Sequence, residues 1–191
     1  MSPSEIIAAF ALVSAGCGSV ATQRDITCGA QPVEVLPNGG LESATPAWTQ
    51  DPPTTALICG APRITPFEGM RAACLGGTDG TVQTLTQQVP LPERAKTATL
   101  SGQICVATSE TQPVDHDVLQ IDLLDGATVV AALGKVTNQQ GAATCQFMAF
   151  SETATMTSDP VTATLRIRAM LDANMPTSFY LDALSVTISC Q

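Results

Sequence analysis

Alternation of apolar and polar residues dominates the chain after residue 26. The clearest stretch is VTATLRIRAMLD at 161–172, where alternate residues from Ala163 to Leu171 are apolar and the positions between them include Arg166 and Arg168. A period of two is typical of a strand with one buried and one solvated face. Because no segment in this region has a helical period of convincing length, we expect an all-β protein.

Similar patterns, separated by turn signals, predict further strands. DVLQIDLLDG at 117–126 ends on an Asp-Gly turn and runs into ATVVAALGKV, which predicts a hairpin. LGGTDG at 75–80 is interpreted as another hairpin turn, and the Pro-rich segment 45–66 as an irregular excursion. Other predicted strands are 32–36, 70–76, 81–90, 97–106, 142–151 and 178–190. Many short strands with turns between them are typical of a two-sheet jelly-roll β-sandwich.

The N-terminal region has the pattern of an export signal. IIAAFALVSAG, at 6–16, is too short to span a bilayer, which takes about 20 residues, and it matches the apolar part of a secretory signal. It leads to Cys17 and resembles a bacterial lipoprotein signal, although Ser14 stands where leucine is usual and no basic residue precedes it. We expect an export segment at 1–17, a tether at 18–31 and the sandwich at 32–191. An ordinary signal peptide and a short buried helix are the alternatives.

Cysteine usage supports an oxidising compartment. The chain has seven cysteines, and setting Cys17 aside leaves an even set of six. There is no CxxC pair, and the single histidine, His116, has no cysteine near it in sequence, which argues against a zinc site. We therefore expect three disulfides, for which the sequence alone allows about fifteen pairings.

Charge narrows the range of partners. The net charge is −9, from eight basic and seventeen acidic residues, which argues against binding to nucleic acid. It also argues against attachment to anionic lipid through basic residues, so any membrane association would come from a lipid anchor. Acidic residues remain available for a hard cation such as calcium. The sequence makes no prediction about oligomeric state.

Six short motifs follow one another along most of the chain. They are LPNGGLES at 36–43, TPAWT at 45–49, EGMRAACLGG at 68–77, TLTQQVPLP at 84–92, DVLQIDLLDG at 117–126 and TSFYLDALSV at 177–186. In this order they resemble the bacterial extracellular jelly rolls of the galactose-binding-like and carbohydrate-binding-module-like type. The resemblance implies a β-sandwich whose first and last strands are neighbours. It also implies a structural calcium, for which the matching positions here are Glu42 and Asp182, with backbone oxygens near Gly40.

The position of Asp182 agrees in part with that implication. Asp182 shares the parity of Leu184, Val186 and Ile188, which predicts an inward-facing side chain. A carboxylate that faces inward needs either a cation or hydrogen-bond donors. A strand-end aspartate satisfied by loop N–H groups is the alternative to calcium.

The same implied topology suggests how the six cysteines pair. The first and last strands would bring their ends together, and the other pairs would join neighbouring strands or close a long loop. The implied disulfides are Cys28–Cys190, Cys59–Cys74 and Cys105–Cys145.

The search for catalytic chemistry is negative. His116 stands between Asp115 and Asp117, which is interpreted as a solvated turn or, alternatively, as a surface metal or pH-sensitive contact. Neither a G-x-S-x-G nor an H-E-x-x-H motif is found. We therefore predict that the protein is not an enzyme.

The remaining hypothesis is a binding surface on the solvated face of the strands. Aromatic residues make up only 4% of the chain, and Trp48 is interpreted either as a packing residue or as a platform for sugar stacking. Polar side chains that could line a binding face are Arg166, Arg168, Gln120, Asp122 and Gln146. An ordinary solvated sheet face would have the same composition.

These observations predict an exported, non-catalytic binding or adhesion module of the cell envelope. Its expected location is the outer membrane, through a lipid anchor, or the extracellular space. The expected ligand is a carbohydrate or glycan surface. A structural surface protein that self-assembles is the alternative.

Overall fold

A computed structural model describes residues 26–45 and 47–190. The predicted export segment and Cys17 lie outside the described residues. None of the helical structure in the described part has the length and apolarity required to cross a membrane. In chain order the elements are β1 (Val33–Glu34), β2 (Thr49–Asp51), β3 (Ile58–Cys59), β4 (Ala72–Gly76), β5 (Val82–Pro90), β6 (Thr97–Thr108), β7 (Val118–Asp125), β8 (Thr128–Thr137), the 3-10 helix η1 (Asn138–Gln140), β9 (Met148–Thr155), β10 (Thr162–Met170) and β11 (Thr177–Ser189).

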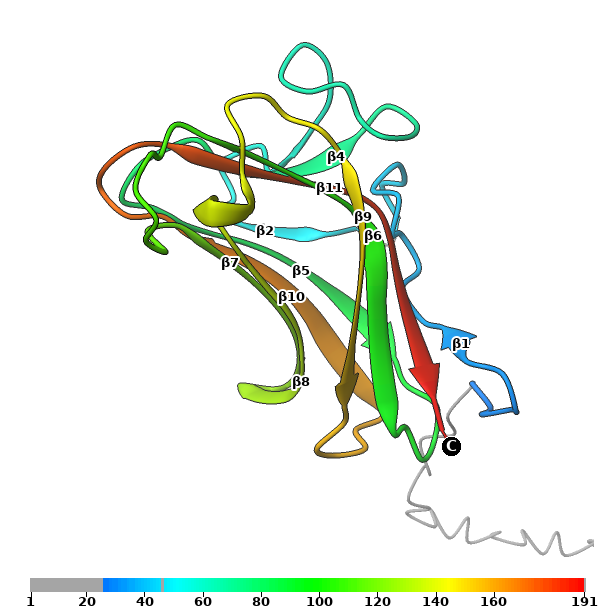
Figure 1. Cartoon of the computed structure of the whole chain (residues 1–191). Coiled ribbons are helices and arrows are strands. Elements are labelled where there is room, and N and C mark those ends of the chain that lie inside the picture. The colour runs from blue at the N-terminus through cyan, green and yellow to red at the C-terminus, as the bar shows by residue number, and fades with distance from the viewer. Residues whose placement is uncertain (1–25, 46, 191) are drawn as a thin grey trace, which may run out of the picture.

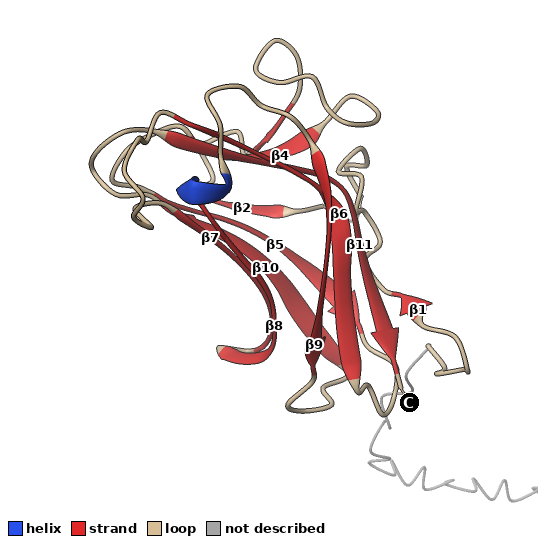
Figure 2. Cartoon of the chain, in the orientation of Figure 1, coloured by secondary structure: helices blue, strands red, loops and turns tan. Residues whose placement is uncertain are grey.

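The strands form two antiparallel sheets that pack face to face (Figures 1 and 2). Sheet A has the order β3-β4-β11-β6-β9, and β1 also pairs with β11. Sheet B has the order β2-β5-β10-β7-β8. The expected all-β class and two-sheet sandwich are confirmed, and the first and last strands are neighbours as the resemblance implies.

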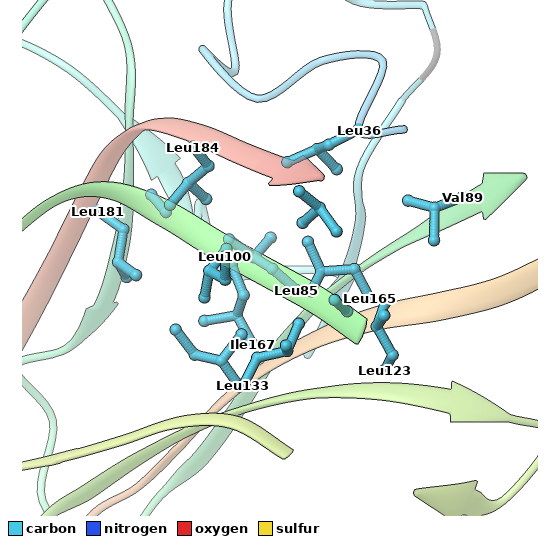
Figure 3. Close-up of a cluster of buried hydrophobic side chains, with 14 of the residues drawn as sticks. Leu36, Leu85, Val89, Leu100, Leu123, Leu133, Leu165, Ile167, Leu181 and Leu184 are labelled. Atoms are coloured by element: carbon cyan, nitrogen blue, oxygen red, sulfur yellow. The ribbon is translucent and has the colours of Figure 1, made fainter. Parts of the chain in front are cut away.

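The core lies between the two sheets. Figure 3 shows side chains from both layers meeting there, including Leu123 and Leu165 of sheet B and Leu100 and Leu181 of sheet A. The alternation in β10 has the predicted consequence, because its apolar positions are buried while Arg166 and Arg168 lie on the opposite face. Each large aliphatic side chain buried in this way contributes about 1.5–3 kcal/mol to folding.

Three local predictions are wrong. The segment 45–66 is not wholly irregular, since it contains β2 and β3. LGGTDG is not a hairpin turn, because β4 belongs to sheet A and β5 to sheet B. The strand predicted at 142–151 begins only at Met148. Turn composition marks where the chain changes direction, but it does not reveal which sheet the next strand joins.

A β-bulge in β11 changes the direction of its side chains. Asp182 pairs with Gln103 and Ser185 with Ser101, so three steps along β11 match two along β6. Ala183 within the bulge has a φ of 49°. The extra residue inverts the alternation between the two halves of the strand.

Asp182 therefore does not face the core, and that prediction is wrong. Before the bulge, Phe179 and Leu181 belong to the core; after it, Leu184 does. Asp182 follows the parity of Tyr180, which packs in a separate small cluster with Cys74 and Cys105. Asp182 is nevertheless 0% exposed, because a loop covers this side of sheet A.

The N-terminal loop docks onto the same bulge. The Leu184 N–H donates to the Gly39 carbonyl over 3.1 Å, and the Val35 N–H donates to the Val186 carbonyl over 2.8 Å. A Cβ atom at Gly39 would stand 1.7 Å from the Leu184 carbonyl oxygen. Only glycine permits so close an approach of two backbones.

Disulfides connect elements of sheet A and its flanking loops. The structure joins Cys28 to Cys190, Cys59 to Cys74 and Cys105 to Cys145. These are the pairs that the resemblance implies. Each such bond typically stabilises a domain by about 2–4 kcal/mol.

Gly39→Ala is expected to destabilise the fold strongly. The added methyl group collides with backbone rather than with a movable side chain, so the loop must leave the bulge at a cost of roughly 3 kcal/mol. Urea denaturation measures this loss. Gly134→Ala is the matched control, because a Cβ there has no neighbour within 4 Å. Equal midpoints for the two variants would contradict the docking.

Candidate functional site

The outer face of sheet B brings together four of the predicted binding residues. Strand β10 lies between β5 and β7, and its register places Arg166 opposite Asp122 and Arg168 opposite Gln120. On the β5 side the same two arginines lie opposite Thr86 and Thr84. Side chains from neighbouring strands in register share a face, so this polar group is continuous across three strands.

Arg166 and Asp122 form the strongest contact on this face. The Arg166 guanidinium donates to the Asp122 carboxylate over 2.6 Å, and the two side chains are 25% and 11% exposed. The Nε atom of Arg166 is buried without a hydrogen-bond partner. The face is therefore less solvated at its centre than the alternation predicts.

The other two predicted binding residues lie elsewhere. Trp48 is 6% exposed within the main core, and its ring N–H donates to the Asn38 carbonyl over 2.9 Å. Trp48 is thus a packing residue, and the stacking alternative is wrong. Gln146 lies before β9 and lines a separate hollow of 250 Å³ with Val106 and Met148.

Exposed apolar side chains gather at a different place. The strands of sheet B contain no aromatic residue. Phe67 is 53% exposed, and its ring packs edge-on against Phe147 with centroids 6.1 Å apart. Met70, 75% exposed, lines a neighbouring hollow of 650 Å³. Sequence reasoning missed this group, because Phe67 stands in a turn-rich loop without any periodic pattern.

Both predicted calcium ligands lie against one loop. The Glu42 carboxylate accepts from the N–H groups of Met70 and Arg71, over 2.8 and 2.7 Å. The Asp182 carboxylate accepts from Glu68 N–H over 3.0 Å and from Ala183 N–H over 2.7 Å. The loop at 68–71 thus connects the two acidic residues.

Gly40 stands beside this loop. A Cβ atom at Gly40 would lie 3.6 Å from a carboxylate oxygen of Glu68 and 4.0 Å from Glu42 Cγ. The loops therefore place a third acidic residue, Glu68, near the predicted ligands.

Asp182 is a buried acidic residue that accepts hydrogen bonds from backbone N–H groups. Within the described part of the chain, no lysine, arginine or histidine lies in ion-pair distance of it. A carboxylate can accept about four hydrogen bonds, so two N–H donors leave acceptor capacity unused. The structure therefore agrees with the alternative in which loop N–H groups hydrogen-bond the Asp182 carboxylate. The same carboxylate still has oxygen lone pairs that could bind a cation.

The segment around His116 is not a uniformly solvated turn. Asp115 is exposed and pairs with Lys135 over 3.0 Å, and this hydrogen bond lowers the pKa of the Asp115 carboxyl. Asp117 is 1% exposed and accepts from the Asp172 N–H over 2.8 Å. The ring of His116 lies 3.1 Å from the Asp172 carboxylate.

Hydrogen bonds hold Asp172 in place. Its carboxylate accepts from the backbone and the side-chain N–H groups of Asn174, over 2.9 and 2.7 Å. These bonds, followed by the charge of His116, lower the pKa of Asp172. Asp172 is therefore an oriented, ionised carboxylate.

Comparison with known proteins defines the fold. No family model matches the chain, and no curated protein matches it in sequence. The chain resembles the solved structure of TmCBM61 in complex with β-1,4-galactotriose at a TM-score of 0.54, 12% identity, 81% coverage of this chain and 97% of that one. It also resembles the CBM22-1 xylan-binding domain of Paenibacillus barcinonensis Xyn10C at a TM-score of 0.50, 14% identity, 87% coverage of this chain and 99% of that one. The chain has the β-sandwich fold of carbohydrate-binding modules.

An enzyme structure contains the same fold as one part of its chain. The arabinose-bound MgGH51 α-L-arabinofuranosidase matches at a TM-score of 0.52 and 11% identity, over 81% of this chain and 26% of the enzyme. Two of the matches are thus carbohydrate-binding modules along nearly their whole length, whereas this one covers a quarter of a larger protein. At such identities the carbohydrate-binding-module likeness defines the fold and not the ligand.

Arg166→Ala is expected to lower the free energy of unfolding by about 1–3 kcal/mol, because it leaves the nearly buried Asp122 carboxylate unpaired. Chemical denaturation measures the change. Arg168→Ala, on the same strand and face, is the control and is expected to stay within about 0.5 kcal/mol of the parent. Equal losses for both variants would show that the ion pair contributes nothing specific.

Proposed function

We propose that this protein is an exported, non-catalytic carbohydrate-binding module of the cell envelope. The glycan would bind on the outer face of sheet B, around Arg166, Arg168, Gln120 and Asp122. The observation that carries the proposal is the register of β10 with β7, which gathers these side chains on one surface. The three disulfides support a location outside the cytoplasm. Lipidation of Cys17 stays a prediction.

Two comparisons support the ligand class. The TmCBM61 structure holds β-1,4-galactotriose, and the CBM22-1 domain is a xylan-binding domain. Both are covered along nearly their whole length by the present chain. The shared fold makes a glycan the first ligand class to test.

Polar recognition is the chemistry that this face offers. Arginine forms paired hydrogen bonds with a carboxylate or with neighbouring hydroxyl groups, and Gln120 supplies both a donor and an acceptor. Because sheet B has no aromatic ring for stacking, binding would depend on these hydrogen bonds. Glycans with acidic sugars would gain most from two arginines.

A second surface on the same molecule offers stacking instead. Phe67 is exposed and braced by Phe147, beside the 650 Å³ hollow that Met70 lines. Sugar rings pack against exposed aromatic faces through their C–H groups. Figure 1 shows the loops before β4 and before β9 together at one end of the sandwich, away from sheet B. The two surfaces can therefore be tested independently.

We also propose a structural calcium between Glu42 and Asp182. The fully buried Asp182 carboxylate has unused acceptor capacity, and Glu68 and the Gly40 backbone lie beside the same loop. Carboxylate and backbone oxygens are the ligands that Ca²⁺ prefers. The ion would hold the loop at 68–71 against the bulge of β11.

Arg168→Ala is expected to weaken glycan binding about tenfold, because one hydrogen bond to a charged group contributes about 1.5–3 kcal/mol. A glycan array identifies the ligand, and calorimetry with the strongest binder measures the affinity. Arg94→Ala is the matched control, since Arg94 is an exposed arginine on the loop between β5 and β6.

The outcomes separate the hypotheses. Loss of binding in Phe67→Ala but not in Arg168→Ala would move the site to the aromatic surface and overturn the sheet B assignment. An array without signal, together with concentration-dependent oligomers in sedimentation, would favour the self-assembling surface protein.

Calcium removal is expected to lower the melting temperature. A ligand present at 100 times its Kd stabilises the folded state by about 2.7 kcal/mol, which corresponds to roughly 5–10 °C for a domain of this size. Differential scanning calorimetry with EGTA, followed by excess Ca²⁺, measures the effect. Glu42→Gln is expected to abolish the response, and Glu152→Gln, an exposed change on β9, is expected to retain it. A melting temperature that ignores both chelator and calcium would refute the site.

A further inference from the structure

Three side chains that can ligate a metal meet where two connections cross between the sheets. One potential ligand atom from each of Glu110, His116 and Asp172 lies within 4.8 Å of the other two. Within the described residues, no other group of three or more His, Cys, Asp or Glu side chains comes this close together. Glu110 and His116 stand on the connection from β6 to β7, and Asp172 stands on the connection from β10 to β11. Figure 1 shows both connections at the same end of the sandwich.

We propose that Glu110, His116 and Asp172 bind a divalent transition-metal ion, with Zn²⁺ as its representative. This site is separate from the glycan surface and from the Glu42–Asp182 pair, so it can be tested independently of the proposed function. It develops the surface metal contact that the sequence leaves open at His116, and it differs from the sequence argument against zinc, which rests on the cysteine spacing.

An unpartnered carboxylate oxygen supports a cation at this cluster. The Glu110 Oε1 atom is buried and has no hydrogen-bond partner. A buried, unpartnered carboxylate oxygen is costly. A cation bound at this cluster would reduce that cost for Glu110, which is one of its three ligands.

Asn138 holds the backbone of the turn that carries the histidine. The Asn138 side chain, from a residue that is 2% exposed, accepts from the backbone N–H groups of His116 and Asp117, over 3.0 and 3.2 Å. It also donates to the Val114 carbonyl over 3.0 Å. Asn138 begins η1, whose capping box involves Thr137 and Gln140. The backbone of the 114–117 turn is thereby held in place before any ion binds.

The Asp172 carboxylate is oriented in the same way. Asn174 donates to both of its oxygens, and Asp117 holds its backbone N–H. Glu110 also lines a hollow of 240 Å³ with Thr108 and Gln139. The cluster therefore holds a prepositioned carboxylate beside this hollow.

The ligand set selects the class of metal. One imidazole and two carboxylates suit Zn²⁺ and related transition metals, which bind nitrogen and oxygen at about 2.0–2.2 Å. Ca²⁺ takes six to eight oxygen ligands and does not favour imidazole. Three protein ligands leave coordination positions for water.

The ion would act as a clip between the two crossover connections. The connections already touch, since the Ser109 N–H donates to the Pro176 carbonyl over 3.2 Å. Both lead from one sheet to the other, so an ion shared by them would resist separation of the sheets at this end. The expected consequence is stabilisation that grows with the free Zn²⁺ concentration.

The test uses the untagged, EGTA-treated full chain and titrates it with ZnCl₂. Because His116 is the single histidine of the chain, its imidazole ¹⁵N signals report on this site alone. We expect one of the ring nitrogens to shift to a metal-bound value at one equivalent, the melting temperature to rise, and CaCl₂ to leave the histidine signals in place.

Variants assign the ligands. Glu110→Gln and His116→Gln are each expected to raise the Kd for Zn²⁺ at least tenfold, since losing even an outer-shell partner costs about 10–100-fold. Asp115→Asn is the matched control next to the histidine, because Asp115 pairs with Lys135 instead. Glu42→Gln keeps zinc affinity unchanged and separates this site from the calcium proposal.

Either of two results would overturn the metal site. Zinc affinity that survives His116→Gln and Glu110→Gln would place the ion elsewhere. Histidine ring signals that respond to pH but not to Zn²⁺ would show that His116 and Asp172 form only an ion pair.

Discussion

A single inserted residue in β11 organises this sandwich. The bulge between Asp182 and Ser185 exposes the Leu184 N–H at the point where Gly39 offers its carbonyl oxygen. That contact fixes the N-terminal loop, which in turn carries Glu42 to the loop at 68–71. Without the extra residue, the alternation of β11 would continue unchanged and the two halves of the strand could not present their apolar residues to one core.

The bulge also explains why a charge can be buried on the outer side of a sheet. Asp182 lies on the face of Tyr180, outside the main core, and the covering loop hides it completely. Its backbone donors come from the bulge itself and from Glu68. Sheet B achieves partial burial differently, since the Arg166 side chain covers Asp122 across one pair of strands. Polar side chains on the outer faces of both sheets are therefore fixed by hydrogen bonds or an ion pair before any ligand binds.

Alternation predicted the sheets well and the sites only partly. The pattern of β10 predicts correctly which side chains are buried and which face carries the arginines. This succeeds because the alternation is a local property of a strand and β10 pairs without a bulge. The alternation predicts the wrong face for Asp182, because one inserted residue leaves no mark in an apolar run. It does not decide between packing and stacking for Trp48, because the choice depends on a distant acceptor, the Asn38 carbonyl.

The His116 cluster shows the same limit more sharply. Asp115, His116 and Asp117 are consecutive polar residues whose environments the sequence does not distinguish. In the structure Asp115 pairs with Lys135, His116 faces Asp172 and Asp117 is buried. Glu110 and Asp172 are 62 residues apart in the sequence (172 − 110). The two connections that cross between the sheets bring them together. Contacts of that range depend on topology, which a local pattern does not contain.

The central position of β11 and β10 has a consequence for how the protein acquires its structure. Each is flanked on both sides by strands that precede it in the chain, β11 by β4 and β6 and β10 by β5 and β7. Neither β4 and β6 nor β5 and β7 can be joined into a sheet until these late strands have been made. Completion of either sheet is therefore delayed until most of the polypeptide is present, and it depends on long-range pairing of the kind that is slow. Earlier intermediates would carry open strand edges, which makes them dependent on protection from aggregation.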